Sequence, residues 1–186
     1  MSSTLTALLF IGLWPFGAAQ AQSPASSVTI TEAEVLKAQK AWGEALIGIS
    51  DAFEKGGIKQ AQAKAEAVLD AAYGYNLGPV LFKPTLSEVP QTFRTTREGA
   101  LAYFVGQNPK FPGDSGFALK GWKQYGFENA AVSIHGDVAM TMGKVRLTNS
   151  KGEVTEVDKT WGFKKGQDGT LRIILHHSSL PYQKNK

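Results

Sequence analysis

Residues 159–182 read KTWGFKKGQDGTLRIILHHSSLPY, and this segment carries the clearest structural signal in the chain. Its two halves are rich in aromatic and β-branched residues, which favour strands. Between them lies Gly166-Gln167-Asp168-Gly169, a typical turn sequence. The segment therefore predicts two antiparallel strands, over Val154–Lys165 and Leu171–Ser178, joined by a tight turn.

Further strand signals precede this hairpin. Two segments with strand-like patterns, Trp122–Glu128 and Ala130–His135, are followed by the turn Gly136-Asp137. The next run, Val138–Thr148, ends at the turn sequence Asn149-Ser150-Lys151-Gly152. The C-terminal part of the chain is therefore predicted to be a meander of four or five antiparallel strands.

The N-terminal part has helical periodicity instead. A T-x-x-E capping box stands at Thr31–Glu34, and apolar residues recur at helical spacing from Val35 onward. Gly56-Gly57 predicts the end of this first helix. A second helix is expected over residues 58–73, and a third, shorter one ends at Gly106. Helices that are segregated from strands predict an α+β fold.

The last two strands and their turn also carry a resemblance to a known superfamily, at Trp161, Phe163, Asp168-Gly169, His177, Ser178 and Ser179. With the preceding helices, they resemble the nuclear transport factor 2-like superfamily, in its SnoaL-like and kinase association-domain branches. The resemblance covers residues 31–182. It implies a cone-shaped α+β barrel, in which three N-terminal helices pack in a curved antiparallel sheet. The open end of the cone would be a pocket.

Strand alternation gives a hypothesis for the pocket wall. In regular strand geometry, His177 shares a strand face with Leu175 and Ile173, whereas His176 points to the other face. Strand twist and bulges could swap which face of the sheet is concave. A histidine in a pocket can act as general acid or base, so His177 is the candidate catalytic residue. Aromatic side chains with polar groups suit a pocket wall. The predicted ligand-binding residues are Tyr73, Tyr75, Asn76, Phe82, Phe104, Trp122, Trp161 and His177.

Other kinds of site find little support. The chain has no cysteine, and its two adjacent histidines face opposite sides of a strand, so no metal site is predicted. A nucleophilic serine would need a motif such as G-x-S-x-G, which is absent from the sequence. No cofactor is expected. Asp158 and Lys159 are interpreted as ordinary surface charges on a strand exterior.

The first residues predict export. An apolar run from Leu5 to Phe16 leads to Ala19-Gln20-Ala21, a cleavage pattern, so residues 1–21 are predicted to be a signal peptide. Residues 22–30 are expected to be a disordered tail and residues 183–186 a frayed end. The mature protein would be periplasmic or secreted, without a membrane segment. Its net charge of +4 comes from scattered residues, so no nucleic-acid partner is predicted.

These observations favour an exported protein that binds a small molecule in a cone-shaped pocket, with no assigned reaction. One alternative is a small lyase or isomerase that uses His177 as acid and base. Another is a homo-oligomerisation domain. Apolar side chains on both faces of the last strand predict a homodimer that covers the outer face of the sheet.

Overall fold

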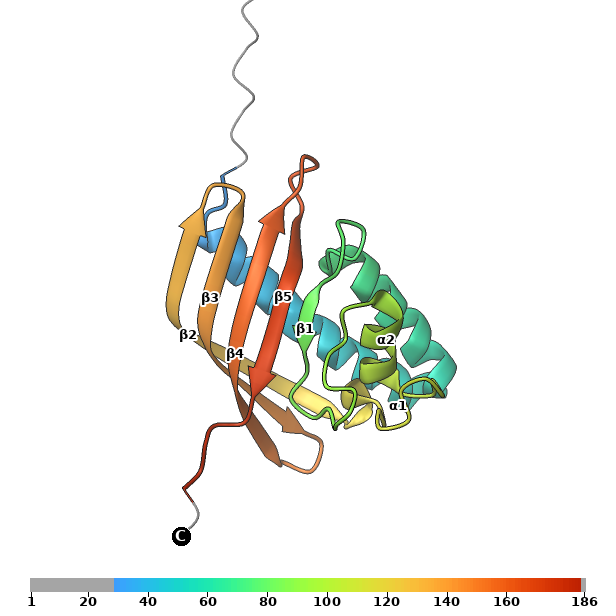
Figure 1. The fold of residues 1–186 in the computed structure, drawn as a ribbon. Helices are drawn as coiled ribbons and strands as arrows, with labels where there is room; N and C mark the ends of the chain where they lie inside the picture. Colours follow the sequence, from blue (N-terminus) through green and yellow to red (C-terminus); the bar gives the residue numbers. More distant parts are fainter. Residues whose placement is uncertain (1–28, 185–186) are drawn as a thin grey trace, which may run out of the picture.

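The computed structural model describes residues 29–184, which form an α+β fold. A five-stranded sheet has the order β1-β5-β4-β3-β2, and the helices lie against one of its faces (Figure 1). The strands are β1 (Leu81–Lys83), β2 (Trp122–His135), β3 (Val138–Asn149), β4 (Val154–Lys165) and β5 (Leu171–Ser179). The predicted signal peptide lies outside the described residues.

The long helix α1 (Glu32–Ala72) begins at the predicted capping box. The Thr31 hydroxyl accepts a hydrogen bond from the Glu34 N–H at 3.3 Å, and the Glu34 carboxylate accepts one from the Thr31 N–H at 2.9 Å. At Gly56 and Gly57 the backbone is not helical, so α1 bends there. The two helices expected on either side of these glycines are therefore the halves of one kinked element.

Three further expectations need correction. With α1 as one element, the described residues contain two α-helices, α1 and α2 (Arg97–Val105), besides the 3₁₀-helix η1 (Phe117–Leu119). Strand β1 pairs with β5 in parallel, so the sheet is mixed and not purely antiparallel. The edge strands β1 and β2 are not neighbours in the described sheet, which is therefore open and not a closed barrel.

The chain before α1 is also more ordered than expected. Ile30, placed in the predicted disordered tail, is buried. Its N–H donates a hydrogen bond to the Gly136 carbonyl at 2.9 Å. Packing of this one apolar side chain therefore fixes the entry to α1 beside the β2–β3 turn.

A β-bulge in β5 determines which histidine faces the helices. Gly162 pairs with Leu175, but Phe163 pairs with Ile173, so Ile174 is an extra residue on β5. An extra residue reverses the inward and outward alternation beyond it. As a result, Ile173 and His176 are both buried beneath the helices.

A second irregularity, in β2 at Asn129, requires a glycine opposite it on β3. A Cβ atom added at Gly143 would lie 2.0 Å from the Glu128 carbonyl oxygen, which is backbone and cannot rotate away. We expect Gly143→Ala to lower the free energy of unfolding by about 2 kcal/mol, measured by urea denaturation. Gly126→Ala is the matched control, since a Cβ there meets nothing within 4 Å. Equal stability of the two variants would contradict this packing.

Candidate active site

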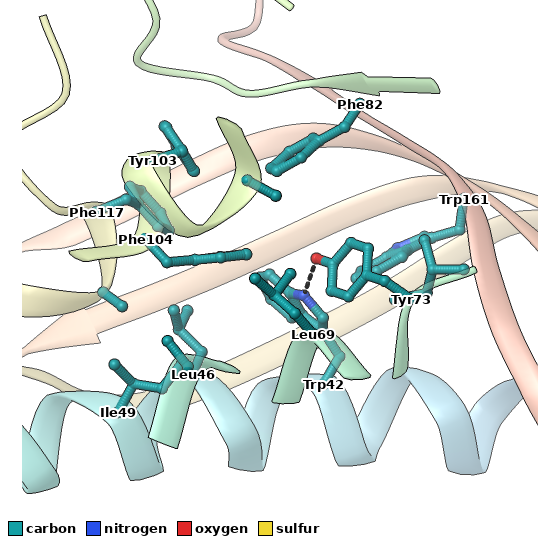
Figure 2. Close-up of a cluster of buried hydrophobic side chains, with 14 of the residues drawn as sticks. Trp42, Leu46, Ile49, Leu69, Tyr73, Phe82, Tyr103, Phe104, Phe117 and Trp161 are labelled. Carbon is teal, nitrogen blue, oxygen red and sulfur yellow. Dashed lines mark hydrogen bonds between the residues drawn. The ribbon is translucent and has the colours of Figure 1, made fainter. Parts of the chain in front are cut away.

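A small cavity lies between the concave face of the sheet and the helices. Its volume is about 10 Å³, about the space that one water molecule needs. Most of its wall is apolar and aromatic, as Figure 2 shows for part of it. The lining residues are Trp42, Phe82, Thr85, Tyr103, Phe104, Phe117, Val145, Leu147, Val157, Lys159, His176 and Ser178.

His176 lies on β5 at the wall of this cavity, and both of its ring nitrogens have partners. Nδ1 is 2.7 Å from the Tyr73 hydroxyl oxygen, and Nε2 is hydrogen-bonded to Lys159 Nζ. Phe82, its register partner on β1, stacks on the imidazole with ring centroids 4.3 Å apart. Trp42 Nε1–H donates to the Tyr73 oxygen at 3.0 Å, the dashed line in Figure 2. The ring is thus fixed in position and orientation.

Lys159 is the buried cation of the site, with 5% of its surface exposed. Its ammonium nitrogen donates to Ser178 Oγ at 2.9 Å, across the β4–β5 pair. The nitrogen also lies 4.8 Å from the ring centroids of Trp42 and of Trp161, a distance at which aromatic faces stabilise a cation. Lys159 and His176 therefore form a contiguous pair of proton-binding groups.

Burial sets the protonation of this pair. Removal from water lowers the pKa of Lys159 well below its usual value. Burial, and then the charges of Lys159 and His177, lower the pKa of His176 well below 6.5. Two positive charges in contact in an apolar setting repel each other, so the pair holds at most one at neutral pH. At least one nitrogen then has a free lone pair to accept a proton.

Hydroxyl groups complete the polar part of the wall. Burial raises the pKa of Tyr103, so its phenol stays protonated and can donate a hydrogen bond. Thr85 lies half-buried in the segment that follows β1, and Ser178 lies on β5. Together with Lys159, these groups offer several donors to a small anion inside a water-poor cavity.

The segment that carries Thr85 is held down by a buried ion pair. Arg94 Nε and Nη2 each donate to the Asp114 carboxylate at 2.8 Å. Arg94 Nη1 also donates to the carbonyl oxygens of Gln91 and Phe93. The guanidinium thereby joins the loop after β1, which carries Thr85, to the loop that leads into η1, whose first residue Phe117 also lines the cavity.

The Tyr73 hydroxyl connects Trp42 to His176, and its removal should have a measurable cost. In Tyr73→Phe, the Trp42 N–H and His176 Nδ1 would both lose a partner in a buried setting. We expect the free energy of unfolding to fall by about 1–3 kcal/mol, measured by urea denaturation. Tyr75→Phe is the control, because that hydroxyl donates only to the Arg94 carbonyl in a half-buried position. A larger loss in Tyr75→Phe would contradict this account.

The family model for metal-independent carbonic anhydrases matches residues 33–180. The chain belongs to this family. A metal-independent carbonic anhydrase from Nostoc sp. (strain PCC 7120 / SAG 25.82 / UTEX 2576) is 57% identical over 162 residues, which cover 87% of this chain and 79% of that protein. Family membership therefore rests on nearly the whole described domain.

A solved structure gives the same result. The crystal structure of the iota-carbonic anhydrase from a cyanobacterium, complexed with bicarbonate, is 57% identical. The similarity covers 88% of this chain and all of that one, with a TM-score of 0.84. A nuclear transport factor 2-like protein from Pseudomonas putida KT2440 is also similar, at 14% identity over 82% of this chain and 87% of that one, with a TM-score of 0.46.

One expectation is overturned by these findings. A binding protein with no assigned reaction was predicted, but a member of the metal-independent carbonic anhydrase family belongs to a family of enzymes. The sequence lacked any recognisable catalytic motif because the polar groups of the cavity are dispersed along the chain. Among residues 29–184, no three His, Asp or Glu side chains form a cluster suited to a metal ion.

The predicted site residues of this carbonic anhydrase family member divide into three groups. Three of them, Tyr73, Phe82 and Trp161, are in ring contact with His176, and a fourth, Phe104, contacts Tyr73 and Phe82. Tyr75 stacks on Tyr73 outside the cavity, and Trp122 packs on Phe117. Asn76 and His177 are exposed, His177 because it lies on the outer face of β5.

Sequence reasoning missed the polar groups that line the cavity. Lys159 was interpreted as surface charge, yet it is buried because it alternates with Val157 and Trp161 on the inner face of β4. That alternation was the available signal. His176 was missed because the bulge at Ile174 is not visible in the sequence. Tyr103 lies on α2 and Thr85 lies in the loop after β1, and no local sequence pattern indicates that either residue reaches the cavity.

Proposed function

We propose that the protein is a carbonic anhydrase that interconverts carbon dioxide and bicarbonate in the cavity beside His176 and Lys159. The observation that carries the proposal is the 57% identity to an iota-carbonic anhydrase solved with bicarbonate. It is supported by the site itself, a small apolar cavity with a proton acceptor and several hydroxyl donors. Carbon dioxide is apolar enough to enter such a cavity, and bicarbonate is an anion that its donors would hold. Because the cavity has room for about one water molecule, its lining side chains must move apart when the substrate binds.

The chemistry follows from these groups. A water molecule in the cavity attacks the carbon of carbon dioxide through its oxygen, and one C=O electron pair moves onto oxygen. The proton that the water loses goes to the neutral nitrogen of the Lys159–His176 pair, as in general base catalysis. The product is bicarbonate, and its negative charge is stabilised by the newly protonated pair, by Ser178 and by Tyr103. Release of bicarbonate and of the proton to solvent completes the cycle.

The low polarity of the cavity strengthens this stabilisation. An anion next to a cation interacts more strongly where few water molecules screen the charges. Fixed donors also need no reorganisation when the charge develops, because Trp42, Tyr73 and Phe82 hold the His176 ring in place. These buried contacts thus fix the donor groups in the positions that bicarbonate requires before the reaction begins.

Stopped-flow measurement of carbon dioxide hydration tests the activity. Purified protein, treated with a metal chelator and then freed of it, should accelerate hydration of carbon dioxide in proportion to protein concentration. Lys159→Met should lose this acceleration, while Lys164→Met, at a half-buried position of the same strand away from the cavity, should retain it. A chelated wild-type protein with no activity would contradict the proposal.

The pH profile gives a further expected result. The reaction requires that the Lys159–His176 pair is not fully protonated, and both pKa values are lowered by burial. As pH falls, the pair therefore loses its free lone pair only below the usual histidine value of 6.5. We expect the acidic limb of kcat/KM for hydration to lie below pH 6.5, measured by stopped flow in several buffers. A limb at or above 6.5 would contradict the assignment.

We also infer that the protein forms a homodimer through the outer face of its sheet. Met140 and Met142 point outward on β3 and are 46% and 62% exposed. Exposed apolar side chains on a sheet face favour association. Analytical ultracentrifugation should show a dimer for the wild type and a monomer for the double variant Met140→Glu, Met142→Glu.

Export to the periplasm or outside the cell stays a prediction of the sequence.

A further inference from the structure

Lys159 is unusual among the lysines of this protein because its amine lines the cavity of the proposed reaction. Its surface is 5% exposed, and Nζ is hydrogen-bonded to His176 Nε2 and, at 2.9 Å, to Ser178 Oγ. In the proposed reaction, carbon dioxide must approach within contact distance of this nitrogen. A neutral amine is a stronger nucleophile toward carbon dioxide than water is.

We propose that Lys159 is reversibly carboxylated by the substrate carbon dioxide, so that its Nζ carries a carbamate in the cavity. This inference rests on the proposed function, because that function brings carbon dioxide to the amine. The Nζ lone pair forms a bond to the carbon, and one C=O pair moves onto oxygen. One N–H proton goes to His176 Nε2, which already contacts Nζ. The reverse steps release carbon dioxide and restore the amine.

The surroundings of Nζ supply what a carbamate needs. The protonated His176 would form an ion pair with the carbamate, and Ser178 and Tyr103 are hydroxyl donors at the same cavity. Burial lowers the pKa of Lys159, which raises the fraction of neutral amine. The Trp42 and Trp161 rings, 4.8 Å from Nζ, favour the ammonium form instead. Carboxylation should therefore be partial and should increase with carbon dioxide concentration.

Carboxylation would also compete with catalysis. The carbamate would occupy the space in which bicarbonate is formed, and it would hold the proton-accepting nitrogen in a covalent bond. The protein would then lose activity reversibly when carbon dioxide is abundant. A small planar anion in the cavity, such as nitrate, should exclude the carbamate.

Chemical trapping locates the carbamate. The full protein is equilibrated with ¹³C-labelled carbon dioxide and bicarbonate, treated with triethyloxonium to fix carbamates as ethyl esters, digested and sequenced by tandem mass spectrometry. We expect the label mainly on Lys159, with much less on half-buried Lys164, because burial lowers the pKa of the Lys159 amine and leaves more of it neutral, whereas Lys164 Nζ is ion-paired with Asp137 and does not line the cavity. Nitrate should reduce the Lys159 label and leave Lys164 unchanged.

Two variants test the base and the site. His176→Gln should clearly lower the label on Lys159, because glutamine can neither accept the N–H proton of the amine nor form an ion pair with the carbamate. Lys164→Met should leave the Lys159 label unchanged. Label confined to exposed lysines in the wild type, or an undiminished Lys159 label in His176→Gln, would overturn the inference.

Hydration activity is measured on untreated aliquots of the same preparation at low carbon dioxide concentration, where little carbamate forms, so that the two proposals fail separately. An active wild type without label on Lys159 overturns the carboxylation and leaves the proposed function standing. Label on Lys159 at high carbon dioxide, in a protein that shows no hydration activity even at low carbon dioxide, supports the carboxylation and overturns the proposed function.

Discussion

His176→Gln is expected to lower kcat/KM for carbon dioxide hydration by about 100- to 1,000-fold, within the range that general acid–base groups contribute. The glutamine amide can still form hydrogen bonds to Tyr73 and Lys159, so the buried network keeps its packing. It cannot accept a proton near neutral pH. Lys159 would remain as the only titratable nitrogen of the pair, and once it is protonated the cavity contains no acceptor.

The adjacent histidine provides the control. His177 lies on the outer face of β5 and is exposed, although it follows His176 directly in the chain. His177→Gln should therefore retain activity within about twofold of the wild type, since single exposed substitutions away from a site have small effects. Both variants are compared by stopped flow after their folding is checked by circular dichroism. A large loss in His177→Gln with little loss in His176→Gln would reverse the assignment and support the residue that the sequence favoured.

Asp114→Asn is expected to lower the free energy of unfolding by about 3–5 kcal/mol, which is the usual cost of removing one charge from a buried pair. The Arg94 and Asp114 side chains are 2% and 1% exposed, and two hydrogen bonds of 2.8 Å join them. The substitution would leave the guanidinium buried without a counter-charge. Urea denaturation followed by tryptophan fluorescence measures the change.

A matched surface pair tests whether burial is the cause. Arg97 and Asp70 also form two hydrogen bonds, at 2.6 and 2.9 Å, but their side chains are 39% and 63% exposed. Water and salt screen such a pair, so Asp70→Asn should produce no clear change in the unfolding midpoint. Equal losses of unfolding free energy in the two variants would contradict the conclusion that the buried Arg94–Asp114 pair holds the two loops together.

Periodicity in the sequence was enough to predict most of the elements. The capping box at Thr31, the break at Gly56-Gly57 and the strands β3, β4 and β5 lie where the pattern placed them, to within a residue. These features depend on local chemistry, namely side-chain alternation, caps and turns. The parallel pairing of β1 with β5 was not predictable in this way, because it joins segments about 90 residues apart.

The site was only partly predictable for a related reason. The aromatic cluster beside the cavity was found because Tyr73, Phe82, Phe104 and Trp161 are aromatic residues of predicted elements that face the core. The chemistry depends on one extra residue in β5, which turns His176 inward and His177 outward. No residue type in that strand requires a bulge. A shift of one position was therefore enough to direct the functional hypothesis to the wrong face of the strand.

A crystal structure of the protein soaked in bicarbonate tests most directly whether this cavity is the site of the reaction. We predict the anion in the cavity, within hydrogen-bond distance of Lys159 Nζ and of the Ser178 and Tyr103 hydroxyls, with His176 still joined to Tyr73. The same soak of Lys159→Met should show the cavity without bicarbonate. Bicarbonate bound elsewhere in the wild type, with this cavity unchanged, would contradict the account.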